Sequence, residues 1–355
     1  MKKLKILIIT PTFFPIVSGN SICARRIAIG LEKSDHEVLI KTPEQVDFDE
    51  IKNFNPDIMH GLHAYKCKII QKLSYKFKIP YLLTLTGSDY EECLIDSINF
   101  EKGLEQSNVK QITLDIMHNA SYLIVYNKRT SKRIIEQFPE FKSKLKVISK
   151  GLPIIDGKDY QFRKSNSIKK TDFVFSLVAG IRIRKNNFCP IESLTELRKK
   201  YPNIILTFVG PVIEEKYNLF LKEKIKNLDW VKAVGAVTVD KMKQIYLESD
   251  VILNCSHYEG ESNAIIEAMY YAKPLIVSNT PGNSPLINDM TDGLLFDVKD
   301  SDEFSRKAQL LLTNKNLREK LSKNAKEKSL QLINLNESKD YVKLYLSAMI
   351  KSKED

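Results

Sequence analysis

Short apolar runs rich in Val, Ile, Leu and Phe recur along the chain and alternate with longer segments of helical periodicity. Strands that alternate with helices predict parallel sheets with helices on both faces, because parallel neighbours need a crossover connection. The runs are Lys5–Thr10, Glu37–Thr42, Asp57–Gly61, Tyr81–Gly87, Tyr122–Asn127 and Leu145–Gly151, then Phe173–Gly180, Ile204–Gly210, Val231–Gly235, Val251–Ser256, Leu275–Asn279 and Gly293–Asp297. This alternation restricts the chain to the α/β class.

The runs fall into two sets, which a polar stretch from Asp156 to Thr171 separates. A chain of 355 residues exceeds one ordinary hydrophobic core, so two doubly wound, Rossmann-like domains are expected. After Asp300 the pattern is purely helical. The predicted parts are a first domain over residues 1–156, a linker over 157–171, a second domain over 172–335 and a last helix over 336–355.

The composition argues against several classes of protein. Contents of 43% hydrophobic and 28% charged residues are typical of a globular protein, and no apolar run reaches the length of a membrane span. The apolar segment Ile6–Ile9 is too short for a signal peptide and has no cleavage site, so a first strand is expected there. Five cysteines without a CxxC pair are typical of reduced thiols in a cytoplasm, not of disulfides or a zinc site.

The formal net charge of +11 raises the question of a nucleic-acid partner. The excess is spread over both halves of the chain and consists mainly of lysine, which is typical of general solubility rather than of one docking patch. We therefore predict no nucleic-acid partner and a cytoplasmic location. Contact with an anionic surface at the inner membrane face stays open, as does the oligomeric state.

The most informative motif holds two acids, Glu259 and Glu267. Glu259 follows the run Val251–Ser256, at the strand end where open α/β sheets bind ligands. Next comes a helix that Ser262 or Asn263 can cap, and its start offers N–H groups and a positive dipole end to an anion. Glu267 lies in this otherwise apolar helix, where an acid is costly unless something pairs with it. The motif predicts a site for a phosphorylated, hydroxyl-rich ligand.

This stretch resembles the Glu-x7-Glu motif of retaining glycosyltransferases of family 4, which have the GT-B fold. The resemblance implies two Rossmann-like domains whose parallel sheets face one another across a cleft, with the last helix packing back on the first domain. It places Glu259 at the donor sugar and Glu267 at the ribose of a nucleotide. The diphosphate would lie at the helix start, which comprises Gly260, Glu261, Ser262, Asn263 and Ala264.

Basic residues follow the first predicted strand of the second domain, within residues 179–187. Cations between a strand end and a helix are placed to neutralise a diphosphate. The family carries Gly-Arg and then a Lys five residues after the Arg, whereas here the Lys follows the Arg by three. The resemblance assigns Lys185 and Arg182 to the diphosphate, with Arg184 able to replace Arg182. A solvated basic turn is the alternative.

Two further loops match the family in part. Where the family has a Gly-Gly loop near the donor phosphates, this chain has Gly19 and Asn20. Where most members have a second Gly-Gly and then a Glu, it has Gly282 and Asn283, with Leu286 in place of the Glu. The resemblance implies that both loops contact the donor; an ordinary βα loop is the alternative for the first.

In the first domain, residues 85–89 read Leu-Thr-Gly-Ser-Asp. With Gly-Ile-Arg, Glu-Gly and Pro-Gly-Asn, this segment is most similar to one branch of the family, the glycosyltransferase domain-containing proteins and selenosugar synthases. In that branch Thr86 stands where many relatives carry a His that contacts the donor sugar. The resulting candidates on the acceptor side are His60, His63, Thr86 and Asp89.

The resemblance implies a retaining glycosyltransferase that moves a sugar from a nucleotide diphosphate sugar, with a uridine nucleotide expected, to an unknown acceptor. No cofactor and no metal are expected, because both Asp-x-Asp pairs, at 47–49 and 300–302, read as solvated acids at helix starts. Glu259 would hold the sugar and not act as a nucleophile. Two alternatives stay open: a GT-B nucleotide-sugar epimerase or hydrolase, and a catalytically idle nucleotide-sugar-binding scaffold, which Leu286 and the altered Arg spacing favour.

Overall fold

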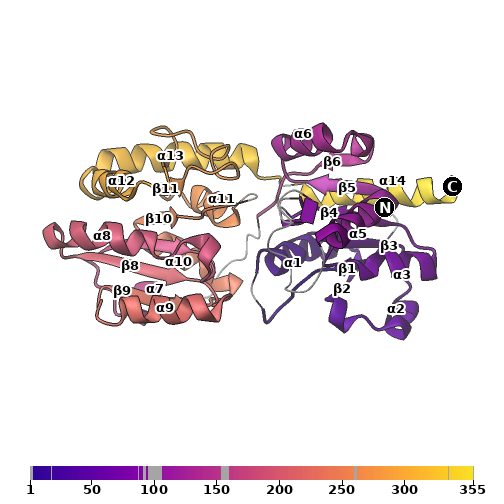
Figure 1. The fold of residues 1–355 in the computed structure, drawn as a ribbon, viewed down its shortest axis with the longest axis horizontal. Coiled ribbons are helices and arrows are strands. Elements are labelled where there is room, and N and C mark those ends of the chain that lie inside the picture. The colour runs from indigo at the N-terminus through magenta and orange to yellow at the C-terminus, as the bar shows by residue number, and fades with distance from the viewer. Residues whose placement is uncertain are drawn as a thin grey trace. The chain divides into compact units, whose positions relative to one another are not determined.

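A computed structural model describes residues 3–16, 18–86, 88–90, 93–94, 106–152, 160–259, 262–334 and 336–354. The chain divides into two compact units (Figure 1). Unit 1 comprises residues 1–152 and 334–355, and unit 2 comprises residues 153–333. Each unit holds a six-stranded sheet in which all described pairings are parallel, so the predicted α/β class with two Rossmann-like sheets is confirmed.

Unit 1 has the strand order β2-β1-β3-β4-β5-β6. Its strands are β1 (Lys5–Ile9), β2 (Glu37–Lys41), β3 (Ile58–Leu62), β4 (Tyr81–Thr84), β5 (Tyr122–Val125) and β6 (Leu145–Val147). Its helices are α1 (Gly19–Glu32), α2 (Phe48–Phe54), α3 (Ile69–Phe77), α4 (Ser88–Tyr90), α5 (Gln106–Asn119), α6 (Lys128–Gln137) and α14 (Glu337–Glu354), with short 3₁₀ helices η1 (Pro43–Gln45) and η3 (Pro139–Phe141).

The two faces of the unit 1 sheet carry separate apolar cores because side chains alternate along each strand. Ile6 and Ile8 of β1 belong to the core that α1 and α14 cover, whereas Leu7 and Ile9 belong to the core on the other face. α14, drawn in yellow in Figure 1, packs against α1 and β4. The last described helix of the chain is therefore part of the first unit.

Unit 2 has the strand order β12-β11-β10-β7-β8-β9. Its strands are β7 (Phe173–Val178), β8 (Ile204–Val209), β9 (Val231–Gly235), β10 (Val251–Asn254), β11 (Leu275–Ser278) and β12 (Leu294–Phe296). Its helices are α7 (Phe162–Ser165), α8 (Cys189–Lys200), α9 (Glu215–Ile225), α10 (Met242–Glu248), α11 (Asn263–Tyr270), α12 (Ser301–Thr313) and α13 (Lys315–Leu332), with 3₁₀ helices η4 (Ile183–Lys185) and η5 (Val239–Lys241).

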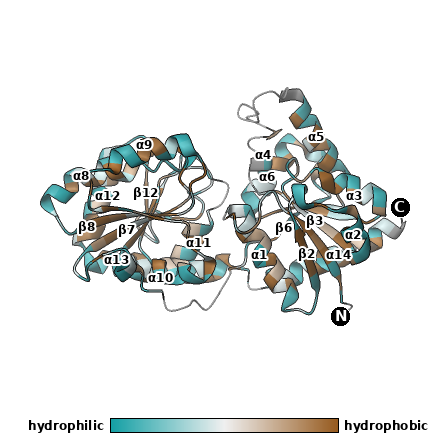
Figure 2. Cartoon of the chain, turned by 90° about the horizontal axis from the view of Figure 1, so that it is seen from below, coloured by the Kyte–Doolittle hydropathy of each residue, from teal (hydrophilic) through white to brown (hydrophobic). Residues whose placement is uncertain are grey.

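Apolar strands lie between two helical layers in unit 2 (Figure 2). Helices α8, α9 and α12 cover one face of the sheet, and α10, α11 and α13 cover the other. The strand order reverses between β7 and β10, as in a doubly wound sheet, and such a switch point is where ligands bind. No helix of the described residues has the length and hydrophobicity to cross a membrane.

The structure differs from the predicted linker over 157–171. From residue 160 on, these residues belong to unit 2, where α7 buries Phe162. The guanidinium of Arg163 donates to the backbone carbonyls of Glu248 at 2.8 Å and Asp172 at 2.9 Å and to Asp250 Oδ2 at 2.7 Å. Polar composition suggested a connection here, but these bonds and the buried ring fix the segment.

Candidate functional site

The loops that follow β7 and β10 lie side by side at the switch point of unit 2. β7 and β10 are adjacent parallel strands, with Leu177 paired to Leu253, so their carboxyl ends reach the same edge of the sheet. The backbone N–H of His257, after β10, donates to the carbonyl of Arg184, after β7, at 2.9 Å. The fold thus brings two segments together that lie far apart in sequence.

Lys185 and Glu259 form an ion pair between these loops, in which Lys185 Nζ donates to Glu259 Oε1. Glu259 is only 6% exposed, and its Oε1 also accepts from Ser256 Oγ at 2.7 Å and Asn254 Nδ2 at 3.2 Å. Burial by itself raises the pKa of the Glu259 carboxyl, but Lys185, the Ser256 hydroxyl and the Arg184 charge together hold that pKa below its ordinary value. Glu259 is therefore an ionised carboxylate in a buried position.

The two arginines of this loop differ in their surroundings. Arg184 lies with its guanidinium 5.2 Å from the centre of the Tyr258 ring, and its charge acts on Glu259. Arg182 is turned to α9, where its Nε lies 3.7 Å from Glu214 Oε1. The structure therefore favours Arg184, the alternative to Arg182, as the second cation beside Lys185 and Glu259.

Helix α11 begins beside this pair, with Ser262 at the N-cap and Asn263 and Ala264 as its first residues. Ser262 does not cap the helix with its side chain; its Oγ accepts from Asn254 Nδ2 at 3.2 Å instead. The N–H groups of the first helical turn have no partner within a helix, so this end offers donors and a positive dipole to an anion. Gly260 and Glu261, predicted as part of this site, lie outside the described residues.

Glu267 lies about one turn from the start of α11 and is half-buried. Its Oε2 accepts a hydrogen bond of 2.7 Å from the hydroxyl of Tyr246 in α10. Burial raises the pKa of Tyr246, and the neighbouring Glu267 carboxylate raises it further. The partner that an acid in an apolar helix requires is thus a tyrosine that the sequence analysis did not single out.

The loop after β11 carries Gly282 and Asn283, which reach the site indirectly. Asn283 is fully buried, and its Nδ2 donates to Asn254 Oδ1 at 3.0 Å and to Ser278 Oγ at 3.2 Å. Leu286, which occupies the position of a family Glu, is buried. This loop therefore contributes the Asn283 amide to the site, and it has no carboxylate at the position of the family Glu.

The candidates in unit 1 separate into two groups. Asp89 Oδ2 accepts from the N–H of Thr86 at 2.6 Å and from its hydroxyl at 3.1 Å, and Asp89 Oδ1 lies 3.0 Å from His63 Nδ1. His63 has a φ of 127°, which residues other than glycine rarely adopt and which is frequent at functional sites. The structure thus brings His63, Thr86 and Asp89 together where β3 and β4 end.

The remaining unit 1 candidates are placed otherwise than the sequence suggested. His60 is fully buried in β3, and its ring nitrogens bond to Tyr345 of α14 at 2.8 Å and to Thr84 of β4 at 2.7 Å. It is therefore occupied in packing α14 on the sheet. Gly19 and Asn20 are the first residues of α1 rather than loop residues, because the capping box of Ser18 and Ser21 starts the helix earlier.

Three polar residues of the site were missing from the sequence-based candidates: Asn254, Ser256 and Tyr246. Asn254 had a signal, because it is the polar last residue of the otherwise apolar strand β10. Ser256 and Tyr246 had no such signal in the sequence, because a single hydroxyl residue does not reveal which side chains it contacts in the fold.

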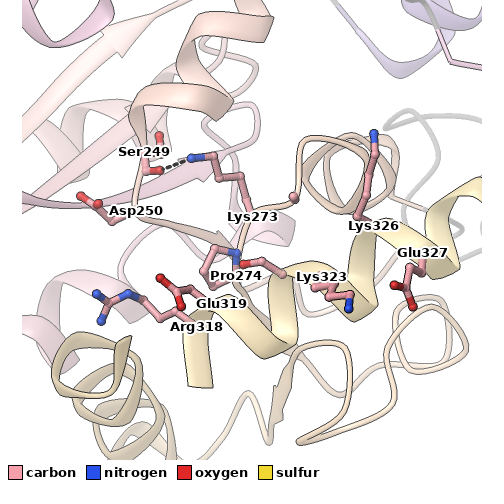
Figure 3. Close-up of a pocket in the computed structure, with 11 residues that line it drawn as sticks. Ser249, Asp250, Lys273, Pro274, Arg318, Glu319, Lys323, Lys326 and Glu327 are labelled. Atoms are coloured by element: carbon pink, nitrogen blue, oxygen red, sulfur yellow. Dashed lines mark hydrogen bonds between the residues drawn. The ribbon is translucent and has the colours of Figure 1, made fainter. Parts of the chain in front are cut away.

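A separate pocket lies at the opposite edge of the same sheet (Figure 3). Its lining includes Asp250 and Lys273, which lie just before β10 and β11, and α13 residues such as Arg318. Lys273 Nζ donates to the carbonyls of Leu247 and Ser249, and the Arg318 guanidinium to the carbonyl of Leu312 at 3.0 Å. These cations are engaged by the protein, and the edge is not the one where open α/β sheets bind ligands.

Comparison with known proteins agrees with the geometry. The family model described as "Glycosyl transferases group 1" matches residues 159–328, which include Lys185, Glu259 and Glu267. Glycosyltransferase 1 domain-containing protein 1 of Xenopus tropicalis is 24% identical over 87% of this chain and 88% of its own length. The UDP-Gal:alpha-D-GlcNAc-diphosphoundecaprenol alpha-1,3-galactosyltransferase of Escherichia coli is 28% identical over 84% of this chain and 78% of its own.

Among solved structures, Anabaena HepE in complex with UDP-glucose superposes with a TM-score of 0.78 over 97% of this chain and 100% of that chain. At 17% identity this likeness shows the fold, which is GT-B. The chain is a glycosyltransferase of the GT-B fold, and its residues 159–328 match the model of the glycosyl transferases group 1 family.

Proposed function

We propose that the chain transfers a sugar from a nucleotide diphosphate sugar to an acceptor with retention of the anomeric configuration and without a metal ion. The observation that carries the proposal is the ion pair of Lys185 with the buried Glu259 beside the start of α11. This arrangement offers a cation, a carboxylate and backbone donors within one switch point. The cation and the backbone donors suit a diphosphate, and the carboxylate suits the hydroxyls of a sugar.

The departing diphosphate is stabilised by fixed charge. Lys185, with Arg184 beside it, supplies positive charge, and the N–H groups at the start of α11 supply aligned donors. Such preorganised groups act most strongly on the charge that develops as the sugar–phosphate bond breaks. The loop after β7 and the start of α11 therefore form the proposed diphosphate subsite.

Glu259 binds the sugar in this proposal and does not attack it. Its Oε1 is held by Lys185, Ser256 and Asn254, and a carboxylate so engaged is a weak nucleophile. An ionised carboxylate is a strong acceptor for sugar hydroxyls. The reaction then proceeds by attack of the acceptor from the face that the diphosphate leaves, which retains the configuration.

The nucleotide is proposed to be uridine diphosphate, with its ribose hydroxyls on Glu267. Support comes from the relatives: the E. coli enzyme is named for UDP-Gal, and the HepE complex holds UDP-glucose. The cluster of His63, Thr86 and Asp89 is the proposed acceptor side in unit 1. The narrower branch with the selenosugar synthases stays a prediction.

The test is transfer with identification of the product. The protein is incubated with UDP-glucose, UDP-galactose or UDP-N-acetylglucosamine and with a set of lipid, glycan and small-molecule acceptors, and products are read by mass spectrometry. We expect one donor to be consumed only when an acceptor is present, and proton NMR of the product to show the α-anomer.

The alternatives predict different outcomes. Conversion of the donor without an acceptor, to free sugar or to its epimer, identifies a hydrolase or an epimerase. Tight binding of the donor without turnover across all acceptors identifies a catalytically idle protein. A β-linked product contradicts the retaining mechanism while leaving the donor site in place.

A further inference from the structure

We propose that Asn254 is a positioning residue of the donor site. Its side chain holds the Glu259 carboxylate in one orientation and links this carboxylate to α11 and to the loop after β11. This inference rests on the proposed function of Glu259 as the sugar-binding group. Asn254 ends β10, is 4% exposed and faces the space between these segments.

The orientation of the Asn254 amide follows from its neighbours. The backbone N–H of Ser256 is 3.2 Å from Oδ1, and a backbone N–H can only donate, so the oxygen must face it. The amide group Nδ2 of Asn283 lies 3.0 Å from the same oxygen. The Nδ2 of Asn254 therefore points the other way, toward Glu259 and Ser262.

All four hydrogen-bonding positions of the Asn254 side chain are then used. Its oxygen accepts twice, and its Nδ2 donates to Glu259 Oε1 and to Ser262 Oγ, each at 3.2 Å. A buried amide with four partners has one stable rotamer, because any rotation leaves buried polar atoms unpaired. Asn254 is thus a rigid reference point for the groups around it.

The three donors to Glu259 all act on the same oxygen. Asn254, Ser256 and Lys185 reach Oε1, and no donor among the described residues reaches Oε2. Fixing one oxygen turns the other away from the network. Oε2 is therefore the atom that we assign to the hydroxyls of the donor sugar.

Asn254 also connects segments with separate tasks. Through Ser262 it contacts the start of α11, where the diphosphate is proposed to bind, and through Asn283 it contacts the loop after β11. A change at Asn254 should therefore affect the sugar more than the nucleotide, because the nucleotide is held by backbone N–H groups and by Glu267.

The test uses Asn254→Ala, which removes the amide, and Asn254→Asp, which replaces the donating nitrogen with a charged oxygen. Probes are UDP and UDP-glucose, titrated by calorimetry. We expect both variants to bind UDP-glucose about 10- to 100-fold more weakly, the scale of a lost hydrogen bond to a charged group. Binding of UDP should change much less in Asn254→Ala.

A second readout is the acid limb of the pH profile of kcat/KM. Loss of a donor to the carboxylate raises the pKa of Glu259, and a neighbouring Asp raises it further. The charged groups that act on Glu259 from the loop after β7, Lys185 and Arg184, are unchanged. The acid limb should move to higher pH in the order wild type, Asn254→Ala, Asn254→Asp.

Asn218 provides the matched control. It is 3% exposed in α9, and its Nδ2 donates to Glu215 Oε1 at 3.1 Å, so Asn218→Ala and Asn218→Asp make the same chemical changes at similar burial. We expect these variants to keep the wild-type preference for UDP-glucose over UDP and the wild-type acid limb. Thermal unfolding of all variants shows whether each is folded.

The outcomes separate the inference from the proposed function. If Asn254 variants are folded and keep both the ligand preference and the acid limb of the Asn218 controls, Asn254 is only structural and the inference is wrong. If the wild type binds neither UDP nor UDP-glucose, the proposed donor is wrong. The pH dependence of unfolding, measured without ligand, then tests whether Asn254 holds the Glu259 carboxylate. The stability that ionised Glu259 contributes should then disappear at a higher pH in the Asn254 variants than in the wild type.

Discussion

Single side chains of the proposed donor site have a structural as well as a chemical role, because they are polar groups that hydrogen-bond to one another in a largely buried place. Glu259 is stable as a carboxylate since Lys185, Ser256 and Asn254 surround it. Removing any one of them changes the pKa of Glu259 together with the shape of the site. Activity and stability must therefore be measured on the same variants.

Lys185→Met should abolish most turnover and also lower stability. The substitution leaves a buried carboxylate without its cation, which costs about 3 kcal/mol of the free energy of unfolding at neutral pH. This loss should shrink as the pH falls, because protonation of Glu259 removes the unpaired charge. Urea unfolding at several pH values measures it, with Lys199→Met, in an exposed pair with Glu196, as a control expected to change little.

The double variant Lys185→Met with Glu259→Gln separates the two effects. It has no buried unpaired charge, so most of the lost stability should return while turnover stays low. A double variant that regains both stability and turnover would show that Lys185 acts only in folding.

Glu267→Gln should weaken the binding of UDP by roughly 1–3 kcal/mol, because a charged acceptor for the ribose hydroxyls becomes a neutral one. The amide oxygen of Gln can still accept from the Tyr246 hydroxyl, so stability should change little. Tyr246→Phe is the control, since it removes that hydrogen bond and keeps the charge of Glu267. Equal loss of UDP affinity in the two variants would assign Glu267 to helix packing.

His60 makes stability depend on pH. Burial lowers its pKa from 6.5 to about 3, so below pH 6.5 the unfolded chain binds a proton that the folded protein does not. The free energy of unfolding should therefore fall as the pH is lowered from 6.5 toward about 3. Urea unfolding followed by circular dichroism should show a shallower decline in His60→Gln, and an unchanged slope would contradict the assignment.

At the scale of elements, the positions of the strands could be predicted from sequence, whereas not every short helix could. Each predicted apolar run overlaps one of the strands β1 to β12, although β3 ends one residue past its run, at Leu62. Several runs extend past the strand into the loop that follows, as from Ile148 to Gly151. The acids at 47–49 predicted the start of α2, where Asp47 is the N-cap. α7 was read as linker because a helix of four residues does not complete a recognisable periodicity, and tertiary contacts such as those of Arg163 hold it instead.

α14 should stabilise unit 1 although it follows unit 2 in sequence. Arg26 of α1 donates to Glu337 of α14 through Nε and Nη2, each at 2.8 Å, and both side chains are buried. Glu337→Gln leaves the guanidinium without its carboxylate, which should cost unit 1 about 3 kcal/mol. Lys343→Gln, which removes an exposed pair with Asp340 on the same helix, is the control expected to be neutral.

The one tryptophan of the chain makes this measurable. Trp230 is buried in unit 2, so its fluorescence reports that unit, whereas circular dichroism reports both. In Glu337→Gln the dichroism transition should begin at lower urea while the fluorescence transition stays in place. A parallel shift of both signals would show that the units unfold together.

At the scale of the whole molecule, the α/β class with two parallel sheets could be predicted from alternation alone. Two acids and a basic loop predicted a candidate site, and the fold brings Lys185 of that loop to Glu259. The arrangement of side chains within the site could not. The choice between Arg182 and Arg184 depends on Glu214, which no local pattern connects to them. The role of His60 depended on Tyr345, which lies 285 residues away.

Transfer should persist in excess chelator. In the proposed mechanism Lys185, Arg184 and the start of α11 neutralise the charge of the leaving diphosphate, and no divalent ion is needed. Activity is measured before and after treatment with EDTA, with magnesium or manganese added back. Activity that disappears with the chelator and returns with the metal would contradict this account of leaving-group stabilisation.

The return of the chain to unit 1 has a consequence for how the protein is made. On the ribosome, residues 1–152 emerge first, but Tyr341 and Tyr345, which complete one of their cores, emerge only after all of unit 2. The half that is synthesised first must therefore wait, with part of an apolar face uncovered, until the half synthesised second is complete. Unit 2 can therefore complete its fold before unit 1 does, against the usual order from the N-terminus. Nascent chains stalled before α14 should depend on chaperones for unit 1 but not for unit 2.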